Sequence, residues 1–166
     1  MKTETLQDLY LKEVRDLYGS EKLLVKSLPK LMEDTELPEL RETLAQHLEE
    51  AKGQLTRLEQ IFQRHGEKPA NKKPKILEGI LREAEDDLSE TPEPSLRDAV
   101  VVAALQQIKH FEIAAYGTLQ TYAIHLGYAD ASRLLQTTLE EERAAEHTFA
   151  NIALNHLRVE AMHHST

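Results

Sequence analysis

The chain has 166 residues, of which 40% are hydrophobic, 30% charged and 5% aromatic, and it contains no cysteine. Its formal net charge of −9 argues against a nucleic-acid partner, because phosphates require a basic face, and the absence of cysteine excludes disulfides and thiolate chemistry. The composition is typical of one helical domain over residues 1–166, and we expect it to be cytoplasmic with no membrane partner, because it shows neither a signal peptide nor a run that spans a bilayer.

The first two predicted helices form a hairpin. Apolar residues recur at helical spacing over residues 3–33, and Pro29 within this stretch predicts a kink or break near Ser27. A tight connection over 33–38 leads into a second helix over 38–65. Gly66 directly after it is a good stop signal.

A second hairpin follows after a long connection. A polar, proline-bearing linker over 67–74 precedes a short helix over 75–88. Ser95 is the expected N-cap of a third long helix, which runs to about residue 126 and stops at Gly127. The fourth long helix is predicted over 130–162, followed by a frayed tail over 163–166.

These connections define an architecture. Short turns within each hairpin make its helices antiparallel, and the long connection lets the third long helix start at the opposite end of the bundle. Two hairpins joined by one crossover form the ferritin-like four-helix bundle, here with a short fifth helix. The alternative is an ordinary up-down bundle with a floppy insertion.

Four glutamates fall at similar depths in this bundle. With a rise of about 1.5 Å per residue, Glu21 and Glu50 each lie about 14 residues from the first turn, near Thr35. Glu112 and Glu142 lie about 16 and 14 residues from the second turn. One inward carboxylate from each helix at a shared level is the arrangement of a four-helix di-metal site.

Glu142 lies within the apolar stripe of its own helix, where an unpaired carboxylate is costly. Glu146, one turn later, can reach the same point. Glu140 and Glu141 are expected to be solvated charges. The alternative for each candidate glutamate is a flanking, partly solvated position.

Several long motifs resemble one known family. They are Leu17–Lys22 (LYGSEK), His47–Gln54 (HLEEAKGQ), His110–Leu119 (HFEIAAYGTL) and Thr138–Ala144 (TLEEERA). In this order they resemble the ferritin-like bacterial stress-protein family typified by YciF, over nearly the whole chain. The resemblance implies a four-helix ferritin-like bundle, a dimer and a candidate di-iron-type centre, without fixing a reaction.

The chain departs from well-understood di-iron bundles, which use Glu-x-x-His on two helices. Gly53 and Ala145 occupy the two histidine positions, so the side chains available one turn on are Gln54 and Glu146. The resembling family often has a second acid where this chain has Lys109, three residues before Glu112.

Two opposed hypotheses follow, of which metal binding is preferred. In the first, iron or manganese binds an oxygen-rich shell and supports oxidation of ferrous iron or handling of oxygen or peroxide. Its predicted ligands are Glu21, Glu50, Gln54, Glu112, Glu142 and Glu146. In the second, the protein is a non-catalytic, protective or structural bundle, in which like charges raise carboxyl pKa values and Lys109 partly neutralises them.

Three further side chains border the predicted site. His47 could act as a ligand, but a hydrogen-bonded flanking role is commoner. His110 points to another side of its helix and is expected to pack behind the ligands or at an interface. For Tyr116, packing is favoured over a hydrogen bond to the site.

Overall fold

The computed structural model describes residues 2–163 of the chain and the side chains of residues 2–155. In this range the chain forms five helices and no strand, which confirms the all-α prediction. They are α1 (Leu6–Glu33), α2 (Pro38–Arg64), α3 (Lys75–Glu90), α4 (Pro94–His125) and α5 (Ala129–His163). None of these helices, over the described residues, is both long and apolar enough to cross a membrane. Of the tail predicted to fray, His163 ends α5 and residues 164–166 lie outside the described residues.

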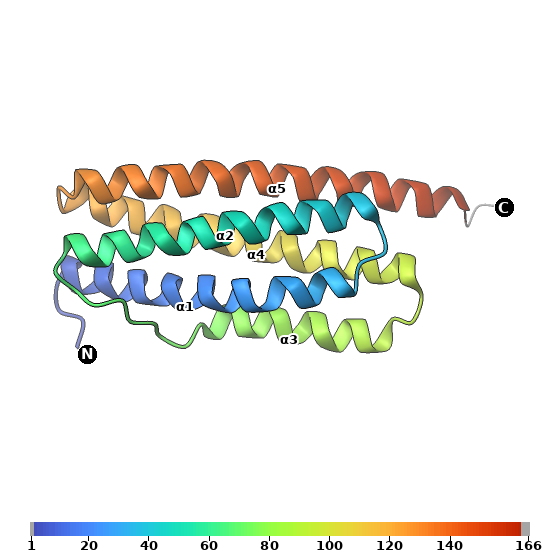
Figure 1. The fold of residues 1–166 in the computed structure, drawn as a ribbon, viewed down its shortest axis with the longest axis horizontal. Coiled ribbons are helices and arrows are strands. Elements are labelled where there is room, and N and C mark those ends of the chain that lie inside the picture. The colour runs from blue at the N-terminus through green and yellow to red at the C-terminus, as the bar shows by residue number, and fades with distance from the viewer. Residues whose placement is uncertain (1, 164–166) are drawn as a thin grey trace.

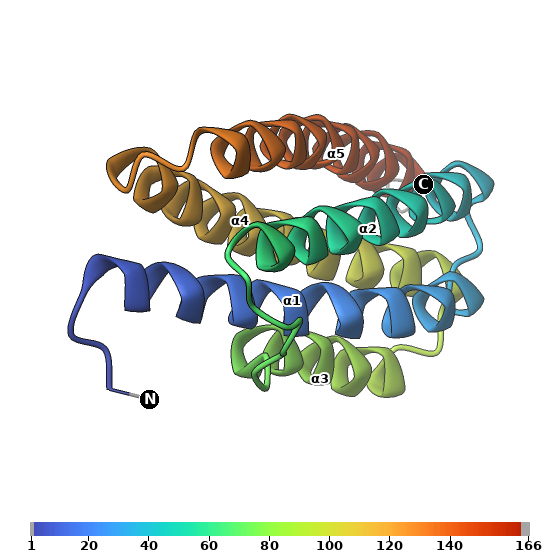
Figure 2. The ribbon, with the colours of Figure 1, turned by 60° about the vertical axis from the view of Figure 1, so that its left-hand side comes forward.

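The four long helices pack as two hairpins (Figure 1). α1 packs on α2 and α4 on α5, and the two hairpins meet through α1 with α4 and α2 with α5. The long connection runs back along the bundle, so α4 begins at the end where α1 finishes (Figures 1 and 2). The predicted ferritin-like arrangement with a crossover and a fifth helix is therefore confirmed.

The crossover is not a floppy insertion, because α3 packs against both α4 and α1 and buries Leu77, Leu81, Ala84 and Leu88. The linker before α3 is also attached to α1. The Lys72 N–H donates to the Arg15 carbonyl at 3.2 Å. A Cβ on Gly19 would lie only 2.1 Å from the Lys72 carbonyl oxygen, so this close approach requires glycine.

Both predicted glycine stops are confirmed. Gly66 and Gly127 have φ values of 66° and 74°, in the left-handed region that L side chains rarely adopt. The residue after each glycine donates back into the last helical turn at 2.9 Å, from Glu67 to Phe62 and from Tyr128 to Ala123. These bonds satisfy carbonyls that the helix end leaves free.

Two local predictions need correction. Of the kink or break predicted near Ser27, the break does not occur: α1 continues through Pro29 to Glu33, because Leu28 and Leu31 on either side are buried and packing keeps the last turn helical. Ser95 lies inside α4, whose N-cap is Glu93 and whose first residue is Pro94. Proline at this position has the φ a helix needs and lacks an N–H that would be unpaired there.

Asp98 has a role that the sequence did not indicate. It is buried, and its two carboxylate oxygens accept from the backbone N–H groups of Glu36 and Leu37 at 2.8 and 2.9 Å. Leu37 is the N-cap of α2 and supplies no side-chain hydrogen bond of its own. A side chain of α4 thus caps α2 from across the bundle.

The apolar core consists of two clusters at opposite ends of the bundle. One, near the α1–α2 turn, includes Leu28, Leu105 and Phe149. The other includes Tyr10 and Phe62. Between them lies a group of buried polar side chains.

Candidate functional site

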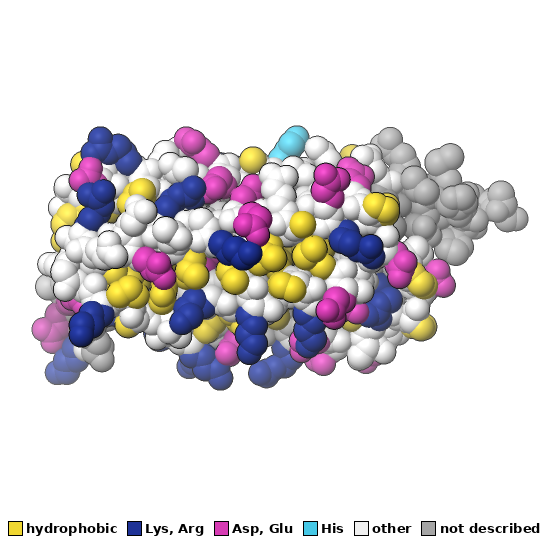
Figure 3. All heavy atoms as spheres, in the orientation of Figure 1, with side chains coloured by type: hydrophobic (Ala, Val, Ile, Leu, Met, Phe, Trp, Pro, Cys, Tyr) yellow, Lys and Arg dark blue, Asp and Glu magenta, His cyan; other side chains and the backbone are white. Residues whose placement is uncertain are grey.

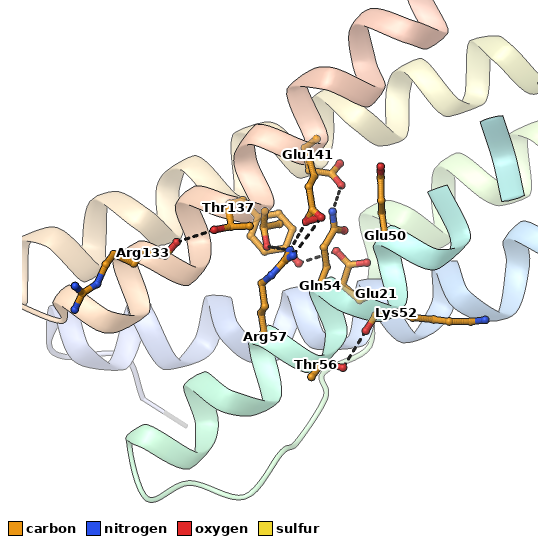
Figure 4. Close-up of polar contacts among 12 residues, drawn as sticks. Glu21, Glu50, Lys52, Gln54, Thr56, Arg57, Arg133, Thr137 and Glu141 are labelled. Carbon is orange, nitrogen blue, oxygen red and sulfur yellow. Dashed lines mark hydrogen bonds and ion pairs between the residues drawn. The ribbon is translucent and has the colours of Figure 1, made fainter. Parts of the chain in front are cut away.

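All four long helices place polar side chains at one level inside the bundle. Each of these side chains is at most 1% exposed. They are Glu21 of α1, His47 and Gln54 of α2, Lys109, Glu112 and Tyr116 of α4, and Glu142 of α5, together called here the Lys109 cluster. Figure 4 labels two of them, Glu21 of α1 and Gln54 of α2.

The Lys109 ammonium is the centre of the cluster. Its Nζ lies 2.8 Å from Glu112 Oε2 and 2.7 Å from Glu142 Oε2. A third neighbour, His47 Nδ1, lies 3.1 Å away. An ammonium group has three hydrogens and no acceptor, so these three contacts account for all of its donors.

Two further hydrogen bonds complete the cluster. Gln54 Nε2 donates to Glu142 Oε1 at 2.6 Å, and the Tyr116 hydroxyl donates to Glu21 Oε1 at 2.6 Å. Among the residues whose side chains the structure describes, four buried side-chain atoms have no hydrogen-bond partner. They are Glu21 Oε2, His47 Nε2, Gln54 Oε1 and Glu112 Oε1.

The carboxyl groups of the cluster differ in their protonation. Burial, together with the nearby charge of Glu142, raises the pKa of Glu21 to about 8. The same two causes raise the pKa of Glu112 well above its ordinary value. Burial also opposes ionisation of Glu142, but the Lys109 charge and a hydrogen bond from Glu112 outweigh it and lower its pKa.

These shifts explain how the cluster remains buried. Protons on Glu21 and Glu112 allow the three carboxyl groups to hydrogen bond to one another, which pairs oxygens that would otherwise be unpartnered. Ionisation is therefore favoured at Glu142, beside the Lys109 ammonium, over Glu21 and Glu112. Burial lowers the pKa of Lys109, whereas the charges of Glu112 and Glu142 raise it. The effect of the two carboxyls is larger, so the pKa of Lys109 is raised.

His47 and Tyr116 stay neutral beside these charges. Burial and the Lys109 charge lower the pKa of His47 to about 3. Burial and the neighbouring Glu21 raise the pKa of Tyr116 well above its ordinary value. The whole group is therefore close to electrically neutral, which is the condition under which buried ionisable groups are tolerated.

The structure brings together four of the six predicted ligands, namely Glu21, Gln54, Glu112 and Glu142. It does not place Glu50 and Glu146 with them. Glu50 is half-buried and accepts from Gln46 Nε2 at 3.0 Å, apart from Glu21 and Gln54 (Figure 4). Glu146 is 28% exposed and lies 3.6 Å from His110 Nε2.

The geometry of α2 explains why Glu50 is displaced. The buried positions of this helix recur at spacings of three and four residues, which is the helical period. They are Leu40, Leu44, His47, Ala51, Gln54, Leu58, Ile61 and Phe62. Glu50 is one residue off this stripe, so its depth matches the cluster while its direction does not.

Two side-chain assignments need correction, those of Tyr116 and Glu141. Tyr116, assigned to packing, donates to Glu21. The His110 side chain, expected to pack behind the site or at an interface, is 67% exposed and lies outside the Lys109 cluster. Glu141 is not merely solvated, because it forms an ion pair with Arg57, which also donates to Thr138 Oγ1 at 3.1 Å and joins α2 to α5 (Figure 4).

The residues present do not fit a two-metal centre. The Lys109 ammonium contacts both Glu112 and Glu142, so a cation already occupies the position where a metal would meet these carboxylates. Over the described part of the chain, no three His, Cys, Asp or Glu side chains are grouped so that they could hold a metal ion. The potential extra ligands Glu50 and Glu146 lie outside the cluster.

Comparisons with known proteins agree with this architecture. The family described as "Domain of unknown function (DUF892)" matches residues 5–162. The protein YciF of Escherichia coli K12 is 36% identical over 162 residues, covering 97% of this chain and 98% of the relative.

Solved structures are also similar to this chain. The E. coli stress protein YciF has a TM-score of 0.89 at 36% identity, covering 94% of this chain and 99% of that one. YcfI, a candidate structural protein of Rhodopseudomonas palustris, has a TM-score of 0.87 at 38% identity, covering 89% and 94%. Protein XCC3681 of Xanthomonas campestris has a TM-score of 0.72 at 22% identity, covering 95% and 99%, and supports the fold alone.

Proposed function

The chain belongs to the DUF892 family, and on that basis we propose that it is a stress-response helical bundle with a structural or protective role and no metal centre. One relative is named as a stress protein and another as a candidate structural protein, which supports this role. The observation that carries the proposal is the position of Lys109 Nζ, 2.8 and 2.7 Å from two buried carboxyls.

Electrostatics disfavour a metal ion beside this lysine. A divalent cation about 4 Å from an ammonium is repelled by about 8 kcal/mol at an effective dielectric constant of about 20. The ammonium also stabilises the ionised form of Glu142, which is what a bound metal ion would otherwise do. In the resembling family this position is often an acid, so lysine both removes a ligand and adds a competing charge.

The competing proposal is the iron or manganese centre expected from the sequence, with oxidation of ferrous iron or handling of oxygen or peroxide. The observation in its favour is the set of unpartnered buried oxygens on Glu21, Gln54 and Glu112. In a metal-free protein, protons held by Glu21 and Glu112 satisfy the carboxyl oxygens of that set instead.

Metal analysis separates the two proposals. Protein purified without a histidine tag is incubated anaerobically with iron(II) or manganese(II), desalted, and analysed for bound metal and for iron(II) oxidation. We expect wild type to retain far less than one metal per chain, to oxidise iron no faster than buffer, and to unfold at the same temperature with and without chelator. Stoichiometric metal that is lost in Glu112→Ala and Glu142→Ala would refute the proposal.

A variant at position 109 tests whether Lys109 prevents metal binding. Lys109→Glu removes the competing cation and supplies a carboxylate beside Glu112 and Glu142. We expect this variant to retain more iron or manganese than wild type under the same loading. Lys12→Glu, a charge reversal at a side chain that is 41% exposed, is the matched control and should not change metal retention.

We also propose that the protein is a cytoplasmic homodimer. The family resemblance supports the dimer, and the absence of cysteine suits a reducing compartment. Light scattering of the purified chain and fractionation of the producing cells test these two points.

A further inference from the structure

A pocket at the crossover has no role in the proposed function. It lies where α1 meets the linker before α3, and it has a volume of about 350 Å³. This volume falls within the range of about 300–1,000 Å³ usual for small-molecule sites. The Lys109 cluster does not line it.

The pocket has an apolar part. Leu17, Ile76 and Phe111 line it, from α1, α3 and α4. Leu17 is fully buried, whereas the Ile76 side chain is 62% exposed at the first turn of α3. An isoleucine left this open beside buried apolar side chains offers a surface on which a short apolar chain gains free energy by burial.

Four lysines surround this apolar part, namely Lys12, Lys72, Lys73 and Lys75, whereas only two acidic residues line the pocket, Glu13 and Asp16. This excess of lysines over acidic residues is unusual in a chain with a net charge of −9. Figure 3 shows Lys and Arg side chains at intervals along the lower edge of the molecule, over α1 and α3.

The lysines are only partly neutralised by the protein itself. Lys12 and Lys72 both pair with Asp16, at 3.5 and 3.4 Å, and both also attract the Glu13 carboxyl. Lys73 pairs with Glu78 at 3.4 Å. Lys75 forms no ion pair with any residue that the structure describes. Positive charge therefore remains available at the mouth of the pocket.

The backbone at this position is fixed and favours an anion. The Lys72 N–H is bonded to the Arg15 carbonyl, which holds the linker against α1. α3 starts at Lys75, and its N-cap, Pro74, supplies no side-chain hydrogen bond. The amino end of this 16-residue helix adds a partial positive charge on the same side as the lysines.

We propose that the pocket binds a small amphipathic anion, with a carboxylate or phosphate head and a short apolar tail. Lys72 and Lys75 hold the head beside the start of α3, and Ile76 and Phe111 cover the tail. The pocket does not depend on Lys109, so this binding stands whether or not the cluster holds a metal.

Calorimetry with octanoate as the probe tests the proposal at low ionic strength, where surface charge is least screened. Octanol, which has the tail without the charge, and inorganic phosphate, which has charge without a tail, are titrated separately. We expect saturable binding of octanoate at one site per chain, weakened by added salt. We expect much weaker binding of octanol and phosphate.

Charge-reversal variants locate the site. Lys72→Glu/Lys75→Glu should bind octanoate at least about tenfold more weakly than wild type. The matched control, Lys26→Glu/Lys30→Glu, makes the same charge change on α1 at lysines that do not line this pocket, and it should bind within about twofold of wild type once long-range charge is screened. Circular dichroism checks that both variants fold.

An apolar variant tests the tail independently of charge. Ile76→Ser should weaken octanoate binding and leave the weak phosphate binding unchanged. The proposal is overturned by the absence of saturable octanoate binding, by equal affinity in the two charge-reversal variants, by octanol binding as tightly as octanoate, or by an Ile76→Ser variant with wild-type affinity.

Discussion

Lys109 Nζ of α4 lies 2.7 Å from Glu142 Oε2 of α5, and both side chains are fully buried. This contact joins the two helices of the second hairpin in the middle of the bundle, between the two apolar clusters. Removing either partner leaves a charge without compensation in a region that water does not reach. The pair therefore determines both the stability of the cluster and its low suitability for a metal.

Lys109→Met should destabilise the protein by about 3–5 kcal/mol, because it leaves buried carboxyls without their counter-charge. Lys109→Met/Glu142→Gln removes both charges and should recover part of this loss, so the two substitutions should not be additive. Urea unfolding measures the four free energies of the cycle. Lys12→Met, at an exposed ion pair, should change stability by less than about 1 kcal/mol. Additive effects of the two cluster substitutions would contradict the contact.

The neutral His47 ring should carry its proton on Nε2. Lys109 has no acceptor, so Nδ1, which lies 3.1 Å from Nζ, must accept from it. Nitrogen-15 NMR of histidine-labelled protein distinguishes the two tautomers directly. In Lys109→Met, which removes the donor, we expect the tautomer preference to weaken. A protonated Nδ1 in wild type would rule out the proposed hydrogen bond.

The sequence predicted the fold well because its signals are local. Helical spacing of leucines, Gly66 and Gly127 as stops, and the difference between short and long connections define the two hairpins and the crossover. The depth of Glu21, Glu112 and Glu142 also follows from counting residues along helices, since the rise per residue is constant.

Direction around a helix was harder to predict than depth. Glu50 has the right depth, but the buried stripe of α2 passes through His47 and Gln54 instead. That stripe was visible in the sequence, so a stricter period along α2 would have favoured His47. The cap that Asp98 forms on α2 had no local signal, because its partners are 61 and 62 residues away.

Glu21→Gln should make the protein more stable relative to wild type as pH rises from 5 to 8. The pKa of Glu21 is raised from 4.5 to about 8, so between these values the folded protein holds a proton that the unfolded chain releases. The contribution of this proton to the free energy of unfolding is fully present below pH 4.5, falls as pH rises, and is lost above pH 8. The slope is at most about 1.4 kcal/mol per pH unit.

Glutamine cannot ionise and still accepts from Tyr116, so it isolates this effect. Urea unfolding at several pH values gives the difference in free energy between wild type and variant. The control Glu49→Gln, at a side chain that is 72% exposed, should follow the wild-type curve. A difference for Glu21→Gln that does not change with pH would show that Glu21 is ionised in the folded protein.

Asp98→Ala should cost about 1–2 kcal/mol, because it removes a charged cap from the N-terminus of α2. It leaves the Glu36 and Leu37 N–H groups without their carboxylate acceptor. Glu93→Ala removes an exposed acid at the N-cap position of α4, where it forms no side-chain cap, and should cost much less. Equal losses in urea unfolding would mean that general charge, and not the cap, is responsible.

Gly19→Ala should destabilise the crossover, because the new Cβ would lie 2.1 Å from the Lys72 carbonyl and displace the linker from α1. Gly53→Ala is a matched control inside α2, where no atom lies within 4 Å of the new Cβ. This second substitution should stabilise the helix by about 0.5–1 kcal/mol, because alanine is the better helix former. We expect urea unfolding to show stability changes of opposite sign for the two substitutions. We also expect faster hydrogen exchange at the Lys72 amide in Gly19→Ala only. Gly19→Ala with wild-type stability and exchange would mean that the linker does not need its close contact with α1.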